Sequence, residues 1–199
     1  MPQTVRARCL LLAVVSLAVA LLPGSGTGAQ DRQKPEEYQA QAFGQGTQLG
    51  QTFNVTVIIY EYSLPEDQQI LIKSFEAAGM QGLVNALSKM RAKGHISITG
   101  TLGYDVGYVR SFPTADGRKI RLITNRPITF GEAWWDTGSG GNSMSFNLSA
   151  LELNIDQKDQ KKGTGTLLPA CQFQINKDHE LEIANLQNPW KLTDILQRK

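Results

Sequence analysis

The sequence predicts an α+β fold: a curved antiparallel sheet or partial barrel of about seven to eight strands, one long helix and a short C-terminal helix. Three observations carry this prediction. Residues 95–134 alternate apolar and polar side chains in four successive segments with short turns, the period-2 pattern of half-buried strands. An apolar period of helical spacing runs through about residues 64–93. Glycines inside the strand pattern permit the bends of a curved sheet: Gly100, Gly103, Gly107 and Gly131.

The predicted helix follows the first strand, residues 52–62, directly. Ser63 and Glu66 have the spacing of a capping box, and Pro65 suits the first turn of a helix. Two glycines within the helix, Gly79 and Gly82, are expected to break it in two.

The hairpin after Phe112 has two candidate registers. A two-residue turn at Asp116-Gly117 pairs Phe112 with Arg121. A three-residue loop over 115–117 pairs Phe112 with Ile120 instead and keeps the apolar side chains in phase. We therefore predict the three-residue loop. A three-residue loop at the next turn, residues 125–127, likewise places Leu122 opposite Phe130.

The remaining chain divides into further strands and two irregular segments. Residues 30–51 are rich in Gln and Gly without an apolar period, which predicts a flexible spacer and a single domain over 52–199. The glycine-rich run 136–142 is expected to be a mobile hairpin tip. Further strands are expected at 143–155 (with a bulge near Ser149-Ala150), 166–175 and 180–186, and a closing helix at 189–199.

The first 29 residues have the pattern of a secretory signal peptide. Arg6 and Arg8 precede an apolar run over 9–22, and small residues up to Ala29 form an acceptable cleavage site. The apolar run is shorter than the roughly 20 residues of a spanning helix, although an uncleaved anchor is the alternative. We expect a secreted or periplasmic protein, cleaved near Ala29, whose mature chain has no transmembrane span.

Charge and cysteine content exclude several classes of function. The chain has 20 Lys and Arg against 18 Asp and Glu, and removal of Arg6 and Arg8 makes the mature chain neutral. A neutral chain gives no electrostatic reason to expect nucleic-acid binding. Cys171 alone remains after cleavage, so no internal disulfide forms, and its apolar phase predicts a buried side chain.

The sequence contains no recognisable catalytic, metal or cofactor motif. The two histidines, His95 and His179, lack metal-ligand spacing to each other or to cysteine. No nucleophile elbow and no dinucleotide-binding pattern occurs. We therefore expect no cofactor and no metal, and an enzyme is not the first hypothesis.

Two charged residues stand out because each interrupts an apolar strand face. Arg110 follows Tyr108 in one segment, and Glu132 precedes Trp134 in another. In the predicted register the two charges lie two strands apart, about 10 Å across the sheet, a span that their side chains can bridge. The first interpretation of this pair is a structural ion pair or the polar end of a cavity, and the second is an anchor for a polar ligand group. For the second, the candidate ligand-binding set is Tyr108, Arg110, Glu132 and Trp134. Trp135 points to the opposite face and is a candidate surface contact.

The order of elements, a strand, a helix, about seven strands and a short helix, resembles the helix-grip arrangement of plant-allergen and lipid-transfer domains over roughly residues 52–199. That resemblance implies a curved sheet wrapped around the helix. A closed lipocalin-type barrel and a two-sheet sandwich are the alternatives. Three hypotheses of function follow, in this order: a module that binds or carries a small apolar ligand, a non-enzymatic surface or assembly protein without a ligand pocket, and an enzyme of unrecognised type.

Overall fold

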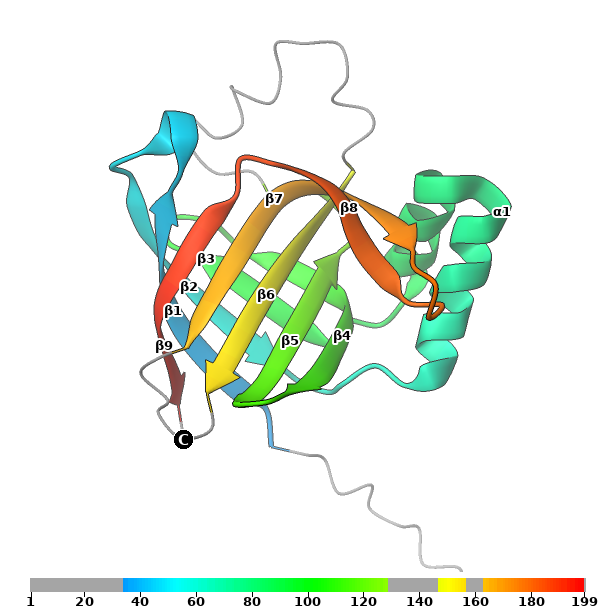
Figure 1. The fold of residues 1–199 in the computed structure, drawn as a ribbon, viewed down its shortest axis with the longest axis horizontal. Helices are drawn as coiled ribbons and strands as arrows, with labels where there is room; N and C mark the ends of the chain where they lie inside the picture. The colour runs from blue at the N-terminus through cyan, green and yellow to red at the C-terminus, as the bar shows by residue number, and fades with distance from the viewer. Residues whose placement is uncertain (1–33, 129–146, 157–162, 199) are drawn as a thin grey trace, which may run out of the picture. The chain divides into compact units, whose positions relative to one another are not determined.

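Eight antiparallel strands close into a barrel in the computed structural model, which describes residues 34–128, 147–156 and 163–198 (Figure 1). All of these residues belong to the unit Gln33–Lys199. The strands are β1 (Glu36–Gly44), β2 (Thr52–Ile59), β3 (Gly94–Ile98), β4 (Tyr104–Thr114), β5 (Gly117–Thr124), β6 (Leu148–Asp156), β7 (Thr164–Ile175), β8 (Leu181–Gln187) and β9 (Trp190–Arg198). A short 3-10 helix, η1 (Gly46–Gln48), lies between β1 and β2, and the helix α1 (Pro65–Lys89) follows β2.

The barrel closes because β6 pairs with both β5 and β7. The strands follow the order β6-β5-β4-β3-β2-β1-β9-β7, and β8 is an extra strand that pairs with β7 beyond the barrel. Closure pairs all eight barrel strands on both sides and leaves none of them at a sheet edge. The prediction of a curved antiparallel sheet or partial barrel with one long helix is confirmed, and the predicted hairpin of 166–175 with 180–186 is also present.

The core inside the barrel consists of side chains that alternate along each strand. In β1, Tyr38, Ala40 and Ala42 are buried, whereas Gln39 and Gln41 between them are partly exposed. In β5 the inward residues are Ile120 and Leu122. This period of two gives each strand one apolar face toward the barrel axis.

A second core lies outside the barrel, beneath α1. The helix stands beside the barrel next to the β7–β8 hairpin (Figure 1). Its buried residues Leu71, Leu83 and Leu87 pack with residues on the outer face of the barrel, among them Tyr108 and Ile123. The helix is broken at Ala78 and Gly79, as predicted near Gly79, where Gly79 has φ +56° and ψ −143°. A helix outside the barrel departs from the helix-grip arrangement, in which the sheet wraps the helix.

The predicted flexible spacer over 30–51 is wrong for β1 and η1. β1 is a central barrel strand that pairs with β2 on one side and β9 on the other. Its alternation of Tyr38, Ala40 and Ala42 with glutamines is the strand signal that the Gln- and Gly-rich composition concealed.

The predicted C-terminal helix is also wrong, because residues 190–198 form β9. The buried residues Trp190, Leu192 and Ile195 change phase at Asp194, which has a positive φ of 52°. The β1–β9 register shifts at this point, as expected of a bulge. A strand with such a bulge has apolar spacings of two and three residues, which imitate a helix in sequence.

The predicted register of the β4–β5 hairpin is wrong by one residue. Phe112 pairs with Lys119, and Thr114 pairs with Gly117, so the turn has two residues, Ala115 and Asp116. A second error lies at Gly107, where a register shift lets Val106 and Val109 both point inward and turns Tyr108 outward. The faces predicted for the second half of β4 therefore reverse.

The two neighbours of β5 are β4 and β6. Leu122 has Val109 on one side and Leu151 on the other, so the predicted pairing of Leu122 with Phe130 is wrong. The predicted bulge near Ser149 is confirmed by a shift of the β6–β7 register between Leu148 and Ala150.

Candidate ligand site at one end of the barrel

The two predicted ligand-binding residues that the structure describes, Tyr108 and Arg110, do not lie inside the barrel. Tyr108 lies on the outer face beneath α1, and Arg110 lies on the same face, where its Nη2 is 2.7 Å from Oε1 of Glu180. The predicted inward position of Arg110 is therefore wrong, because the register shift at Gly107 precedes it. Glu132, Trp134 and Trp135 lie outside the described residues.

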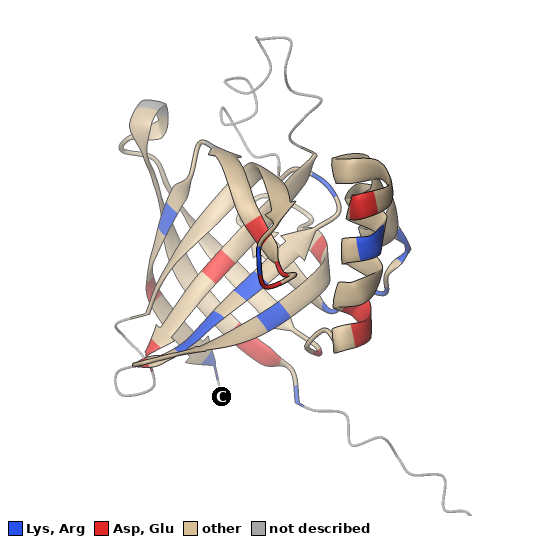
Figure 2. Cartoon of the chain, turned by 45° about the vertical axis from the view of Figure 1, so that its right-hand side comes forward, with Lys and Arg blue, Asp and Glu red and all other residues tan. Residues whose placement is uncertain are grey.

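Arg110 belongs to a charged cluster on the outer wall of β4, β5 and β6. The cations of Arg110, Lys119 and Arg121 lie 5.3–5.4 Å from the ring centroid of Phe112. Arg121 pairs with Glu152 at 2.7 Å and donates a 2.6 Å hydrogen bond to the carbonyl oxygen of Leu181. Figure 2 shows that positively and negatively charged residues lie on neighbouring strands of the barrel wall. The cluster fastens that hairpin to the barrel and leaves little charge unpaired.

The inner face of the barrel carries a different ion pair, between Glu36 and Arg118. Glu36 is the first residue of β1, and Arg118 is the second residue of β5. Both have the inward phase of their strands, since Glu36 is two residues from Tyr38 and Arg118 is two residues from Ile120. Nη2 of Arg118 lies 2.5 Å from Oε2 of Glu36, and the two side chains are 29% and 17% exposed.

Two tyrosine hydroxyls complete this inner cluster. Tyr38 donates to Oε2 of Glu36 at 2.5 Å, and Tyr62 donates to Oε1 at 3.0 Å. Each hydroxyl in turn accepts a hydrogen bond from Arg118, at 2.7 Å for Tyr38 and 3.1 Å for Tyr62. One carboxylate thus receives bonds from a guanidinium and two phenols, an arrangement that recognises a planar anion with both its oxygens.

Local structure explains why Tyr62 reaches this cluster. β3 pairs with β4 through three residue pairs only. Beyond them the neighbour of β4 is the segment before α1: Ser63 N donates to Val109 O at 2.8 Å, and Val109 N donates to Ser63 Oγ at 3.0 Å. This pairing continues the barrel wall through an irregular segment and holds the adjacent Tyr62 at the end of the barrel.

The electrostatics of the cluster favour the charged pair and the neutral phenols. Burial alone raises the pKa of Glu36, but hydrogen bonds from Tyr38 and Arg118 and the charge of Arg118 outweigh it, so the pKa lies below its usual value. Burial, followed by the hydrogen bond to the Glu36 carboxylate, raises the pKa of Tyr38. Burial and the negative charge of Glu36 likewise raise the pKa of Tyr62. At neutral pH the cluster therefore holds one anion, one cation and two hydroxyl groups.

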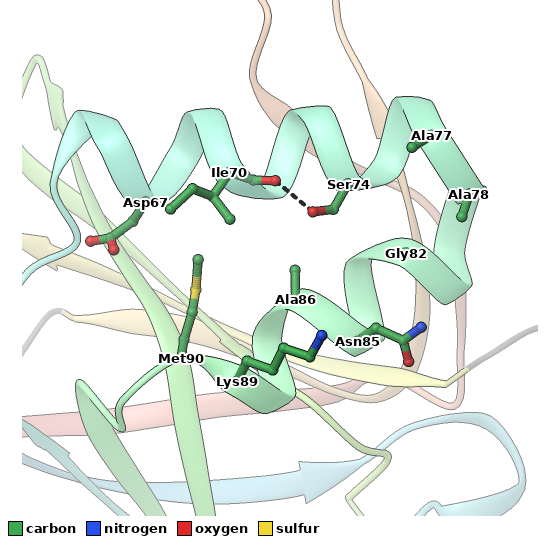
Figure 3. Close-up of a pocket in the computed structure, with 10 residues that line it drawn as sticks. All are labelled: Asp67, Ile70, Ser74, Ala77, Ala78, Gly82, Asn85, Ala86, Lys89 and Met90. Atoms are coloured by element: carbon green, nitrogen blue, oxygen red, sulfur yellow. Dashed lines mark hydrogen bonds between the residues drawn. The ribbon is translucent and has the colours of Figure 1, made fainter.

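A hollow between the two halves of α1 is the competing site (Figure 3). It has a volume of about 480 Å³, and Ile70, Ala86 and Met90 point into it. Two of its polar groups are engaged within the chain: Ser74 Oγ donates to Ile70 O at 2.7 Å, and Asp67 pairs with Lys93 at 3.2 Å. Lys89 also lines the hollow. The hollow is lined mainly by apolar side chains, whereas four polar groups meet in the inner cluster of Glu36, Arg118, Tyr38 and Tyr62.

Other chemistry is sparse in the part of the chain that the structure describes. These residues contain no group of His, Cys, Asp and Glu side chains suited to a metal ion, and none of their helices is long and apolar enough to span a bilayer. Cys171 is buried as predicted, and burial raises the pKa of its thiol to about 12, which keeps it protonated and poorly reactive. His95 pairs with Asp105 at 3.0 Å on the surface.

Sequence reasoning missed both charged members of the inner cluster. Glu36 lies in the Gln- and Gly-rich segment 30–51, which was predicted to be a flexible spacer and not a strand. Arg118 shares the phase of Ile120 and Leu122, so it is the lone charge on an inward face, and that signal is present in the sequence.

Comparisons with protein-family models, with curated proteins and with solved structures found no match for this chain. The class that the fold itself defines is an antiparallel eight-stranded barrel with one outer helix.

Proposed function

We propose that this protein is a small-molecule binding module whose ligand has an apolar body and a carboxylate, and that Arg118 receives the carboxylate. The observation that supports this proposal is the convergence of one guanidinium and two phenol hydroxyls on a single carboxylate inside the barrel. The interior of an eight-stranded barrel is wide enough either to be filled by side chains or to hold one small ligand.

Stability alone is a weak reason for such a cluster. Removing two opposite charges from water costs several kcal/mol, and a well-packed apolar pair of similar volume is often as stable or more so. Groups with shifted pKa values also gather at functional sites, and Glu36, Tyr38 and Tyr62 all have shifted values. The cluster therefore favours a binding role.

The ligand carboxylate takes the place of the Glu36 carboxylate. Glu36 is the terminal residue of β1, where pairing with β2 is present and pairing with β9 begins only at Glu37. Its side chain can therefore turn outward without breaking the barrel. The apolar body of the ligand lies beside the aliphatic side chains that adjoin the cluster, Ile59 opposite Glu36 and Ile155 opposite Arg118.

Export through the leader over residues 1–29 is part of this proposal, because that segment has the pattern of a secretory signal peptide. N-terminal sequencing of the exported protein tests it. A mature chain that begins near residue 30 supports export, and a chain that retains Arg6 and Arg8 contradicts it.

Native mass spectrometry tests the binding function with dodecanoate as the probe. The delipidated wild-type protein is expected to form a one-to-one complex, and Arg118→Met is expected to lose it. Arg198→Met is the matched control, because Arg198 pairs with Glu37 at 3.4 Å on the outer side of the same strand end. Equal dodecanoate binding by the two variants would contradict the role of Arg118. No binding by the wild type would reject the proposal and favour a barrel without a ligand.

A further inference from the structure

The opposite end of the barrel contains a buried polar side chain that nothing in the proposed function uses. Gln48 belongs to η1, at the tip of the β1–β2 hairpin, and is only 3% exposed. Neither its Oε1 nor its Nε2 has a hydrogen-bond partner among the described residues. Buried amides without partners are rare in native proteins because each forfeits its bonds to water.

The main chain of Gln48 lies on the inner side of β1. Gly44 continues the inward phase of Tyr38, Ala40 and Ala42, and a Cβ atom on Gly44 would collide with the carbonyl oxygen of Gln48. Only a glycine at position 44 permits this approach. The carbonyl of Gln48 therefore packs closely against the main chain of Gly44 at the end of β1.

The turn does not need the Gln48 side chain. Its main chain makes hydrogen bonds of its own: Gly44 N donates to Gln51 O at 3.0 Å, Leu49 N to Gly46 O at 3.2 Å, and Gln51 N to Gln48 O at 3.1 Å. The next residue, Leu49, is 82% exposed. The tip thus buries an amide and exposes a leucine, the reverse of the order that stability favours, and such reversals are expected at functional positions.

Two aromatic side chains lie at the same end of the barrel. Trp190 pairs with Gly44 across the β1–β9 ladder, and its ring centroid lies 4.5 Å from that of Phe53. Phe53 is opposite Ala42 and so has the inward phase. This end of the barrel therefore combines two packed aromatic rings, of which Trp190 is buried, with one amide that has a donor and an acceptor side by side.

We propose that Gln48 is the polar contact of a second small-molecule subsite, which takes a neutral planar group that carries a hydrogen-bond donor and acceptor side by side. A carboxamide or lactam attached to an aromatic ring has this chemistry. Its two hydrogen bonds satisfy Oε1 and Nε2 of Gln48 together, and its ring packs at the end of the barrel that holds Phe53 and Trp190. This subsite is independent of Arg118, which lies at the other end of the barrel.

Titration with benzamide, followed by nuclear magnetic resonance of the 15N-labelled protein, tests the subsite. The wild-type spectrum is expected to show saturable shifts of one glutamine side-chain NH2 signal and of the main-chain amides of residues 44–51. Gln48→Leu should weaken benzamide binding about ten-fold or more, because it removes both hydrogen bonds while keeping the apolar volume. Gln45→Leu, at an exposed position of the same tip, is the matched control and should bind as the wild type does.

Three results would overturn the proposal. One is the absence of saturable shifts in the wild type, as expected if the partner of the amide is a buried water. Another is equal affinity of Gln48→Leu and the wild type for benzamide. The last is a lower melting temperature of unliganded Gln48→Leu relative to Gln45→Leu, which would mean that the amide already has a partner within the chain. Loss of benzamide binding in Arg118→Met is not expected, so this test and the dodecanoate test fail separately.

Discussion

Glu36 and Arg118 form an ion pair inside the barrel although 82 residues separate them in the sequence. On the outer side of the same end of β1, Glu37 pairs with Arg198, which is 63% exposed. One strand end thus presents a partly buried pair and a solvent-exposed pair, and the two serve as a matched comparison.

A double-mutant cycle on the inner pair should give a large coupling. Arg118→Met leaves the Glu36 carboxylate partly buried without its cation, and we expect the free energy of unfolding to fall by about 2–4 kcal/mol, since breaking a buried pair costs roughly 3–5 kcal/mol and some water reaches this one. Adding Glu36→Gln should recover much of that loss. Denaturant unfolding measures all variants. The same cycle on Glu37 and Arg198 should give a coupling below about 1 kcal/mol, and equal couplings for the two pairs would contradict the account.

The stability of the protein should depend on the protonation of Glu36. Its pKa in the folded protein lies below the ordinary value of 4.5, so between these two pKa values the unfolded chain binds the proton more readily. The contribution of Glu36 is therefore complete above about pH 4.5 and is lost as the pH falls through the folded pKa. Denaturant unfolding from pH 3 to pH 7 should show the wild type and Glu36→Gln converging at the acid end. A constant difference between them at all pH values would show that the charge of Glu36 does not matter.

Arg121 should contribute more to stability than Arg110, although both lie beside Phe112. Arg121 is 8% exposed and donates to the Leu181 carbonyl, whereas the Arg110–Glu180 pair is about one-third exposed. We expect Arg121→Met to cost about 2–3 kcal/mol, because it leaves a buried carbonyl and Glu152 short of a donor. Arg110→Met should cost less than about 1 kcal/mol. Hydrogen exchange should show the loss of protection in Arg121→Met concentrated in β7 and β8, and a uniform loss would argue against the fastening role.

Gly82 sets the closest approach between the two halves of α1. A Cβ atom at this position would collide with the carbonyl oxygen of Ser74, so Gly82→Ala must push the halves apart. Alanine ordinarily stabilises a helix relative to glycine, but here we expect a loss of about 1–3 kcal/mol from overpacking. Gln81→Ala, at the exposed neighbouring position, should change the stability by less than about 0.5 kcal/mol. Thermal unfolding distinguishes the two, and a stabilised Gly82→Ala would contradict the packing described here.

The sequence predicted the curved antiparallel sheet and the broken helix because apolar periods record which face of an element is buried. It did not predict where the periods are interrupted. The bulges at Gly107 and Asp194 each shift the phase by one residue, and a bulge is stabilised by the neighbouring strand, which a local pattern does not contain. β1 was missed for a related reason, since its glutamines face outward on a strand whose β9 partner is far away in the sequence.

The same register shifts explain why the predicted position of Arg110 in the candidate site was wrong. The prediction paired Arg110 with Glu132 inside a curved sheet. Its placement of Arg110 is wrong, and Glu132 lies outside the described residues. Arg110 lies on the outer face because of the bulge that precedes it, and the pair that the barrel encloses is Glu36 with Arg118. The meeting of β1 with Arg118 depends on barrel closure, which no local spacing determines.

The most direct test of the account follows the carboxylate carbon of dodecanoate labelled with 13C at that position. We predict one bound resonance in the wild type, with a pH midpoint below that of the free acid, because Arg118 and two hydroxyls stabilise the bound anion as they stabilise Glu36. The resonance should be absent in Arg118→Met and present in Arg198→Met. A bound resonance that persists in Arg118→Met, or a midpoint equal to that of the free acid, would contradict the claim that Arg118 receives the ligand carboxylate.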